Sequence, residues 1–179
     1  GTMARRPDLE KFAEEHGLKV GTIADLIHYR IANEKSVERV AECDLPTEYG
    51  EFRLYAYQDI VNKGLHLALV MGDVSAEEPT LVRVHVQSVL RDLVGSEIPD
   101  QPTWGINKCL QAVAEKGRGV IVLLARAESS DQLLASIDMA LGQGTPGGAM
   151  TPDSYTTVGL GSQILRDLGV GKIHLMGAP

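Results

Sequence analysis

The chain has 179 residues, of which 44% are hydrophobic and 23% are charged, and its formal net charge is −7 at pH 7. This composition is typical of a globular domain with a core of its own. The acidic balance argues against a nucleic-acid-binding protein, because such proteins usually present a basic surface to the phosphate backbone. The most apolar run, residues 119–125, is too short to span a bilayer, and no signal peptide is visible at the N-terminus. We therefore expect a cytoplasmic protein that binds neither nucleic acid nor membrane.

Residues 1–34 have the pattern of two short helices. Pro7 suits the first turn of a helix, and Gly17 suits the left-handed position that ends it. Thr22, with Asp25 three residues later, is typical of the start of a second helix. Two short helices cannot bury a core of their own, so we predict that this segment is a helical appendage of a larger unit.

The rest of the chain, residues 35–179, has strands first and then strands alternating with helices. Strands are expected at residues 36–44, 51–57, 65–71, 81–86, 120–124 and 172–176, and helices at residues 105–115, 131–141 and 156–168. The first two strands should form an antiparallel hairpin. This order predicts an α/β fold, a mixed sheet with helices on its faces.

Two of these elements carry more specific expectations. Residues 120–124 show no alternation of apolar and polar side chains, which predicts a central strand covered on both faces. Ser129 or Ser130 is predicted to cap the next helix. That helix is expected to turn four apolar side chains inward, namely Leu133, Leu134, Ile137 and Leu141.

Three stretches carry a resemblance to a known enzyme family: LVRVH at residues 81–85, EKGRGV at 115–120 and GLGSQILRDLGV at 159–170. Through them, residues 35–179 resemble GTP cyclohydrolase II, which opens the purine ring of GTP and releases formate and pyrophosphate. Residues 1–34 resemble the tail of 3,4-dihydroxy-2-butanone 4-phosphate synthase. This order of segments is similar to that of the bifunctional riboflavin-biosynthesis proteins. The resemblance implies a GTP cyclohydrolase II-like fold and a homodimer.

The resemblance also implies a zinc ion held by three cysteines, and this chain has other residues at those positions. The first ligand position is Ser88, and the other two fall within residues 99–102. No cysteine occurs between Cys43 and Cys109, and Cys109 is expected to be a small buried hydrophobe. A hydrolytic zinc site usually needs three protein ligands and a bound water. We therefore expect no zinc and no other cofactor.

The catalytic positions implied by the resemblance are altered as well. The general acid/base falls on Ser154 and the nucleophilic arginine on Thr156, and neither can do that work without an activating base. Either residue is more simply the N-cap of the following helix. The glycine-rich phosphate loop falls on residues 127–133, which keep neither its glycines nor its arginine.

Three polar residues remain as candidate phosphate ligands: Arg83, His85 and Gln87, the last of which replaces a family glutamate. The alternative is an Arg83 side chain in solvent and a hydrogen-bonded His85. We expect a non-catalytic domain that forms a homodimer, or that stabilises or regulates an upstream synthase domain, and GTP binding is doubtful on this interpretation. The alternatives are an active GTP cyclohydrolase II-type hydrolase with an altered site and a sensor that binds nucleotide without turnover.

Overall fold

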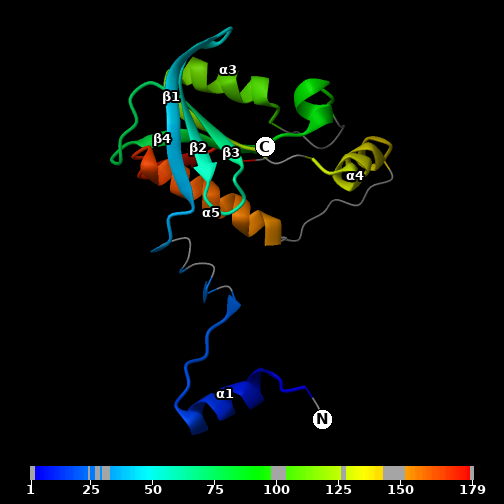
Figure 1. Cartoon of the computed structure of the whole chain (residues 1–179). Helices are drawn as coiled ribbons and strands as arrows, with labels where there is room; N and C mark the ends of the chain where they lie inside the picture. The colour runs from blue at the N-terminus through cyan, green and yellow to red at the C-terminus, as the bar shows by residue number, and fades with distance from the viewer. Residues whose placement is uncertain are drawn as a thin grey trace. The chain divides into compact units, whose positions relative to one another are not determined.

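The computed structural model describes residues 3–23, 25–26, 29, 33–97, 104–125, 128–142 and 152–177 (Figure 1). The chain divides into two compact units, residues 1–34 and residues 35–179. Among the described residues, no helix combines the length and the apolar character that crossing a membrane requires.

The first unit contains α1 (Arg6–His16), which ends at Gly17 in the left-handed conformation, as predicted. The predicted capping box of a second helix is also present. The Thr22 hydroxyl accepts a hydrogen bond from the Asp25 amide, and the Asp25 carboxylate accepts one from the Thr22 amide, each at 3.0 Å. Both large apolar side chains of α1 are about half exposed, so the described part of this unit buries little apolar surface.

The second unit is built on a six-stranded mixed sheet with the strand order β1-β2-β3-β5-β4-β6. Its strands are β1 (Val37–Thr47), β2 (Gly50–Asp59), β3 (Leu65–Met71), β4 (Pro79–Val86), β5 (Gly119–Leu124) and β6 (Lys172–Leu175). The pairs from β1 through β3 to β5 are antiparallel, whereas β4 runs parallel to both β5 and β6. This arrangement confirms the predicted hairpin and the mixed α/β sheet.

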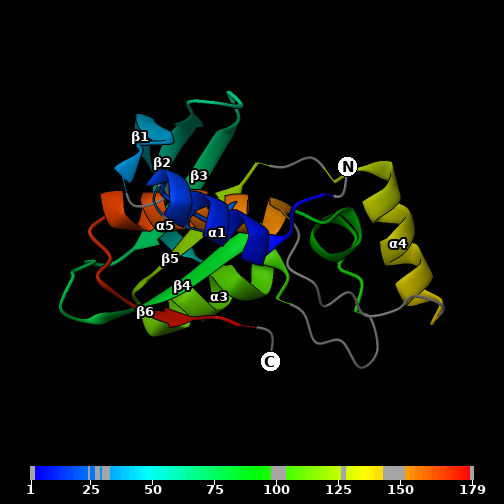
Figure 2. The same cartoon turned by 90° about the horizontal axis from the view of Figure 1, so that it is seen from below.

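One helix covers each face of this sheet, α3 (Ile106–Lys116) on one side and α5 (Pro152–Asp167) on the other, as Figures 1 and 2 show. A π-helical turn, η1 (Val89–Leu93), follows β4. The core under α3 contains Phe52, Leu69, Cys109, Leu110, Val113, Ile121 and Met176. The core under α5 contains Val37, Tyr57, Ala68, Val70, Val82, Val120, Val122, Leu124, Leu160, Ile164 and Leu165.

β5 is the central strand that its uninterrupted apolar sequence predicts. Val120, Ile121 and Val122 are fully buried. Val120 and Val122 belong to the core under α5, while Ile121 belongs to the core under α3. Because both faces of this strand are covered, both need apolar side chains.

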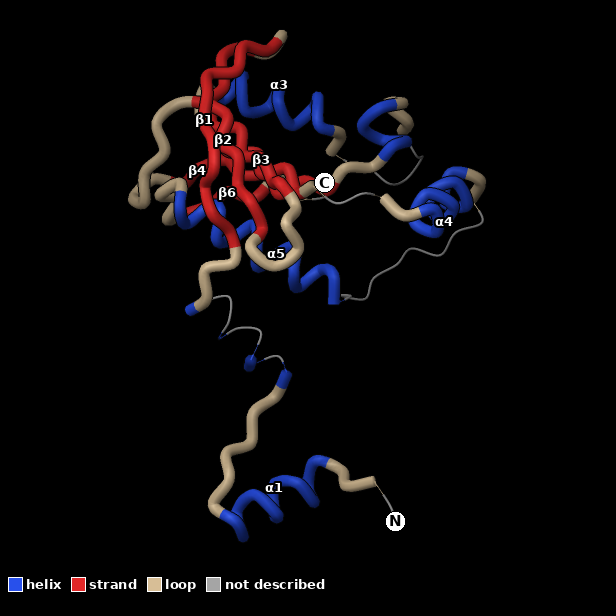
Figure 3. Tube along the Cα trace, in the orientation of Figure 1, coloured by secondary structure: helices blue, strands red, loops and turns tan. Residues whose placement is uncertain are grey.

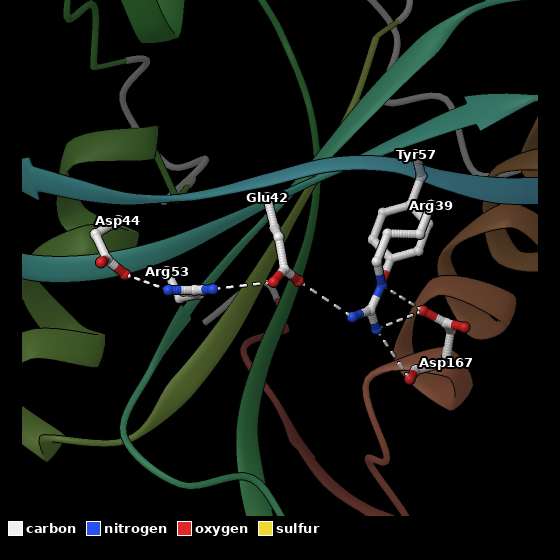
Figure 4. Close-up of polar contacts among 6 residues, drawn as sticks. All are labelled: Arg39, Glu42, Asp44, Arg53, Tyr57 and Asp167. Carbon is white, nitrogen blue, oxygen red and sulfur yellow. Dashed lines mark hydrogen bonds and ion pairs between the residues drawn. The ribbon is translucent and has the colours of Figure 1, made fainter.

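α5 packs closely against the sheet at two places. A Cβ atom on Gly161 would lie 3.1 and 3.2 Å from the methyl groups of Val84 on β4, so a glycine allows the close approach. At the end of α5, the Asp167 carboxylate accepts hydrogen bonds from the Tyr57 hydroxyl at 2.8 Å and from Arg39 at 2.7 Å (Figure 4). These contacts join the last turn of the helix to the β1–β2 hairpin.

The contact with Asp167 is one end of a row of charges along the hairpin (Figure 4). Arg39 also approaches Glu42 at 3.5 Å, and Arg53 pairs with Glu42 at 2.9 Å and with Asp44 at 2.7 Å. Because these side chains are partly exposed to solvent, the row contributes little stability. It does place charges along the edge strand β1, which discourages pairing with other chains.

Two predictions about helix caps have opposite outcomes. Ser129 caps α4 (Ser130–Ala140) as predicted, because its hydroxyl accepts a hydrogen bond from the Gln132 amide at 3.2 Å. The prediction that Ser154 or Thr156 is an N-cap is wrong. α5 begins at Pro152, so both residues lie inside its first turns. Proline suits the first position of a helix, so a start at Pro152 is compatible with the sequence. The pattern of the residues that follow Pro152 does not indicate that the helix has already begun.

The predicted inward face of α4 (Ser130–Ala140) is also wrong. Leu134, Ile137 and Leu141 are 58%, 39% and 64% exposed, and Leu133 is only partly buried. α4 lies beside η1 and away from the sheet (Figure 3). The amphipathic pattern predicts the apolar stripe correctly, but it does not specify what covers that stripe.

Replacing Gly161 with valine should destabilise the second unit by about 2 kcal/mol, because the new side chain overpacks the contact with Val84. The matched control is Ser162→Val, which adds the same side chain at an exposed neighbouring position of α5. Urea denaturation of both variants tests the prediction. Equal free energies of unfolding for the two variants would contradict it.

Candidate functional site

A cavity of about 260 Å³ opens at the carboxyl ends of the parallel strands β4 and β5. In α/β proteins, ligands commonly bind at this edge of the sheet. The apolar part of the wall is formed by Leu65, Leu67, Leu93, Ile106, Leu123, Leu124 and Ala125. The polar lining residues are His85, Gln87 and Asp92.

The Asp92 carboxylate is the centre of the hydrogen bonding beside this cavity, and its side chain is only 5% exposed. Its Oδ2 accepts hydrogen bonds from the Ser88 amide at 2.8 Å and from His85 Nε2 and Arg91 Nη2, both at 2.9 Å. Its Oδ1 accepts from the Ile106 amide at 3.0 Å and from Arg91 Nε at 3.1 Å. One side chain thus connects the end of β4, the turn η1 and the start of α3.

The contact with α3 replaces a missing helix cap. The N-cap residue, Gly105, has no side chain that could accept a hydrogen bond from the first amides of the helix. Asp92 accepts that bond from Ile106 and also places a negative charge at the positive end of the helix dipole. The local sequence therefore needs an acceptor from elsewhere, and Asp92 supplies it.

Asp92 is ionised and His85 is neutral near pH 7. Burial alone would raise the pKa of Asp92, but the hydrogen bonds from Arg91, from the Ser88 amide and from His85 hold it well below its ordinary value of 3.8. Burial lowers the pKa of His85 below its ordinary value of 6.5, against a smaller opposing effect of Asp92. An ionised carboxylate only accepts hydrogen bonds, so His85 Nε2 carries the proton and donates it.

The structure brings two of the three candidate phosphate ligands to the cavity. His85 and Gln87 line it, whereas Arg83 is outside the lining and donates from Nη1 to the Met176 carbonyl at 2.7 Å. His85 is hydrogen-bonded, as the alternative interpretation of the sequence expects. Arg83 is partly buried rather than solvent-exposed. Phosphate binding by these residues stays a prediction.

The donors around the cavity do not fit a zinc ion. Ser88, at the first ligand position implied by the resemblance, offers a hydroxyl where a thiolate would be needed. Within the described ranges, no group of three or more His, Cys, Asp or Glu side chains could hold a metal. Residues 99–102, where the other two ligand positions fall, lie outside the described residues.

The segment that replaces the phosphate loop adds acidic groups beside η1 and α4. The Glu128 carboxylate accepts a hydrogen bond from the Val89 amide at 2.9 Å, and Asp131 lies in the first turn of α4. Residue 127 lies outside the described residues. This segment therefore stabilises a turn and a helix start, and its charges disfavour a polyphosphate.

The sequence pattern did not single out Asp92 or Arg91 as members of the site. One signal was available: the helix predicted at residue 105 begins with a glycine and has no capping side chain. An acidic residue in the preceding loop is a natural substitute. The sequence does not show which acidic residue folds back to that position.

Comparisons with known proteins agree with this architecture. The profile of the GTP cyclohydrolase II family matches residues 38–179. The chain is 51% identical, over its whole length, to 3,4-dihydroxy-2-butanone 4-phosphate synthase from Pseudomonas syringae pv. tomato, of which it covers 48%. It is 40% identical to riboflavin biosynthesis protein RibBA from Aquifex aeolicus, with 98% of this chain and 45% of that protein covered. The chain therefore spans about half the length of these curated relatives.

A solved structure is similar over the whole chain. It is described as the crystal structure of RibBX, a two-domain 3,4-dihydroxy-2-butanone 4-phosphate synthase from A. baumannii. The sequence identity is 43% and the TM-score is 0.63, and the match covers 100% of this chain and 45% of that one. The comparison supports the fold predicted from the resemblance.

The Asp92→Asn variant should lose about 3 kcal/mol of stability, because an amide nitrogen would face donors and leave Arg91 without its buried counter-charge. The matched control is Asp44→Asn, which neutralises the 81% exposed partner of Arg53. Urea denaturation of the control should give an unchanged midpoint. Equal losses in the two variants would contradict a structural role of Asp92.

The stability lost in the Asp92→Asn variant should depend on pH. Because the folded-state pKa of Asp92 lies below the unfolded value, its contribution to stability is present above about pH 4 and is lost as the pH falls towards the folded-state pKa. The stability difference between the wild type and Asp92→Asn should therefore be constant from pH 7 to pH 5 and shrink towards pH 3. A difference that grows on acidification would contradict the assignment.

Proposed function

The chain belongs to the GTP cyclohydrolase II family, in a form associated with riboflavin biosynthesis and linked to 3,4-dihydroxy-2-butanone 4-phosphate synthase, and from this premise we propose that residues 35–179 are a non-catalytic module. The proposed module keeps the scaffold of the family without its hydrolytic chemistry. It serves an attached synthase domain as a structural, dimerising or regulatory partner.

The observation that carries this proposal is that the Asp92 carboxylate is fully used in hydrogen bonds within the protein. In a hydrolase that uses zinc, the polar groups of this region would be available to hold the metal or to move a proton. Here the Asp92 carboxylate is surrounded by five internal hydrogen-bond contacts from Ser88, His85, Arg91 and Ile106. An ionised, fully paired carboxylate supports the fold and is a poor general base.

Ser154 and Thr156 support the same proposal by their chemical nature. Both are on α5, where the resemblance places a general acid/base and a nucleophilic arginine. A hydroxyl at these positions lacks the acidity of a carboxyl group and the charge of a guanidinium group. Turnover of GTP by the route of the family would therefore need groups that this chain does not place there.

A role in association is proposed from the same resemblance. The second unit has a hydrophobic core on each side of its sheet, which suits a scaffold. Residues 1–34 are proposed to be the tail of the synthase domain, because they bury little apolar surface by themselves. Pairing through residues 35–179 would then hold two synthase domains together.

Purified protein should contain well under one zinc ion per chain and should release no formate from GTP. Elemental analysis and a formate assay measure the two quantities, and a GTP cyclohydrolase II with its three cysteines is the positive control. Stoichiometric zinc together with formate release would contradict the non-catalytic proposal. It would favour the alternative of an active hydrolase with an altered site.

The proposed structural, dimerising or regulatory role is tested in a longer protein that carries both the synthase domain and residues 35–179. Removing residues 35–179 should lower the synthase activity several-fold or convert a dimer to a monomer, because the pairing module is lost. Activity assays and sedimentation velocity report the two effects separately. Unchanged activity and unchanged oligomeric state would refute both the regulatory and the dimerising role.

A further inference from the structure

We infer that the cavity at the carboxyl ends of β4 and β5 is a binding site for a small, uncharged, largely apolar ligand, such as a one- or two-ring heterocycle. The inference goes beyond the proposed non-catalytic role, which requires no ligand. It rests on the shape of the cavity, on its charge and on a free amide group at its mouth.

The first observation is the size and the composition of the wall. The cavity of about 260 Å³ is smaller than the pockets that take drug-sized ligands, which start at about 300 Å³. Seven of the ten described residues that line it are apolar: Leu65, Leu67, Leu93, Ile106, Leu123, Leu124 and Ala125. Such a wall favours the burial of an apolar ring over that of a hydrated group.

The second observation is the charge around the cavity. Among the residues that the structure describes, neither lysine nor arginine lines the cavity, and the lining carboxylate, Asp92, is ionised. The nearby Arg91 is already committed, because it donates to Asp92 and, at 2.6 Å, to the Val86 carbonyl. A nucleoside triphosphate would bring several negative charges beside the ionised Asp92, which repels them. The cavity therefore selects against polyphosphates.

The third observation is the state of the polar side chains in the wall. His85 Nε2 is hydrogen-bonded to Asp92, whereas His85 Nδ1 is buried and has no hydrogen-bond partner among the described residues, and the neutral imidazole forms an aromatic part of the wall. The exposed Gln87 side chain makes no hydrogen bond within the part of the chain that the structure describes. Its amide offers one acceptor and two donor hydrogens without a charge. Gln87 is thus the polar group that would orient a ligand at the mouth of the cavity.

Indole is a suitable probe because it has two fused rings, no charge and one N–H group. In a ¹H–¹⁵N correlation titration of the full chain, indole should shift the amides of Leu65, Gln87, Leu93 and Ala125 in a saturable manner. GTP and pyrophosphate, added at the same concentrations, should leave these amides unshifted. Saturable binding of GTP at these amides, or the absence of indole binding, would overturn the inference.

A filled cavity provides the matched variant. Ala125 lines the cavity and is exposed, so Ala125→Trp should weaken indole binding at least tenfold while the thermal midpoint stays unchanged. Val158→Trp adds the same side chain at an exposed position of α5, in the layer on the opposite face of the sheet from α3. That control should bind indole like the wild type. Equal binding by both variants would show that indole binds elsewhere.

The role of Gln87 is tested with 1-methylindole, which lacks the N–H group. The wild type should prefer indole by about fivefold, the effect of one hydrogen bond. In Gln87→Ala this preference should disappear. A preference that persists in Gln87→Ala would contradict the orienting role. This result is independent of the proposed non-catalytic function, which only zinc content and GTP turnover would overturn.

Discussion

The structure around the cavity depends on one buried carboxylate. Asp92 receives the amide at the end of β4, the imidazole of His85, the guanidinium of Arg91 and the first amide of α3. Without this acceptor, the helix would begin at Gly105 with its first amides unpaired. The negative charge of Asp92 therefore supports the start of α3. The same carboxylate fixes the orientation of His85 and pairs with Arg91. These hydrogen bonds are the basis of the proposal that the groups serve the fold.

Several residues in the stretches that resemble GTP cyclohydrolase II are explained by their packing contacts in the fold. Gly161 lets α5 approach Val84, and Asp167 joins the end of that helix to Tyr57 and Arg39. Gly117 ends α3 in the left-handed conformation (φ +70°). Each of these contacts is required by the scaffold and is independent of any reaction. These stretches can therefore be explained by packing, whether or not the chain opens a purine ring.

Much of the fold could be predicted from the sequence because its signals are local. The uninterrupted apolar run of β5 indicates a central strand, and Ser129 followed by Gln132 indicates a helix start. The predictions failed where the answer depends on a distant partner. The apolar stripe of α4 was expected to face inward, but its partner, η1, is too short to cover it. α5 begins at Pro152, four residues before the predicted start at Thr156.

The candidate site was harder to predict than the fold. The altered positions Ser88, Ser154 and Thr156 could be named from the sequence, because each stands in a recognisable stretch. Asp92 could not, since its partners lie at both ends of the connection from β4 to α3 and meet only in the folded chain. The contact of Arg83 with the carbonyl of Met176 likewise joins β4 to the segment after β6. Side-chain to backbone contacts of this kind have no sequence signature.

The central claim is that the polar groups of this region serve the fold and not a metal. The most direct measurement is an NMR titration of the Asp92 carboxyl carbon and the His85 ring nitrogens, with and without one equivalent of zinc. The account predicts an Asp92 pKa well below 3.8, a neutral His85 protonated on Nε2 at pH 7, and no change on addition of zinc. Zinc-induced shifts of the His85 nitrogens or the Asp92 carboxyl carbon would contradict it.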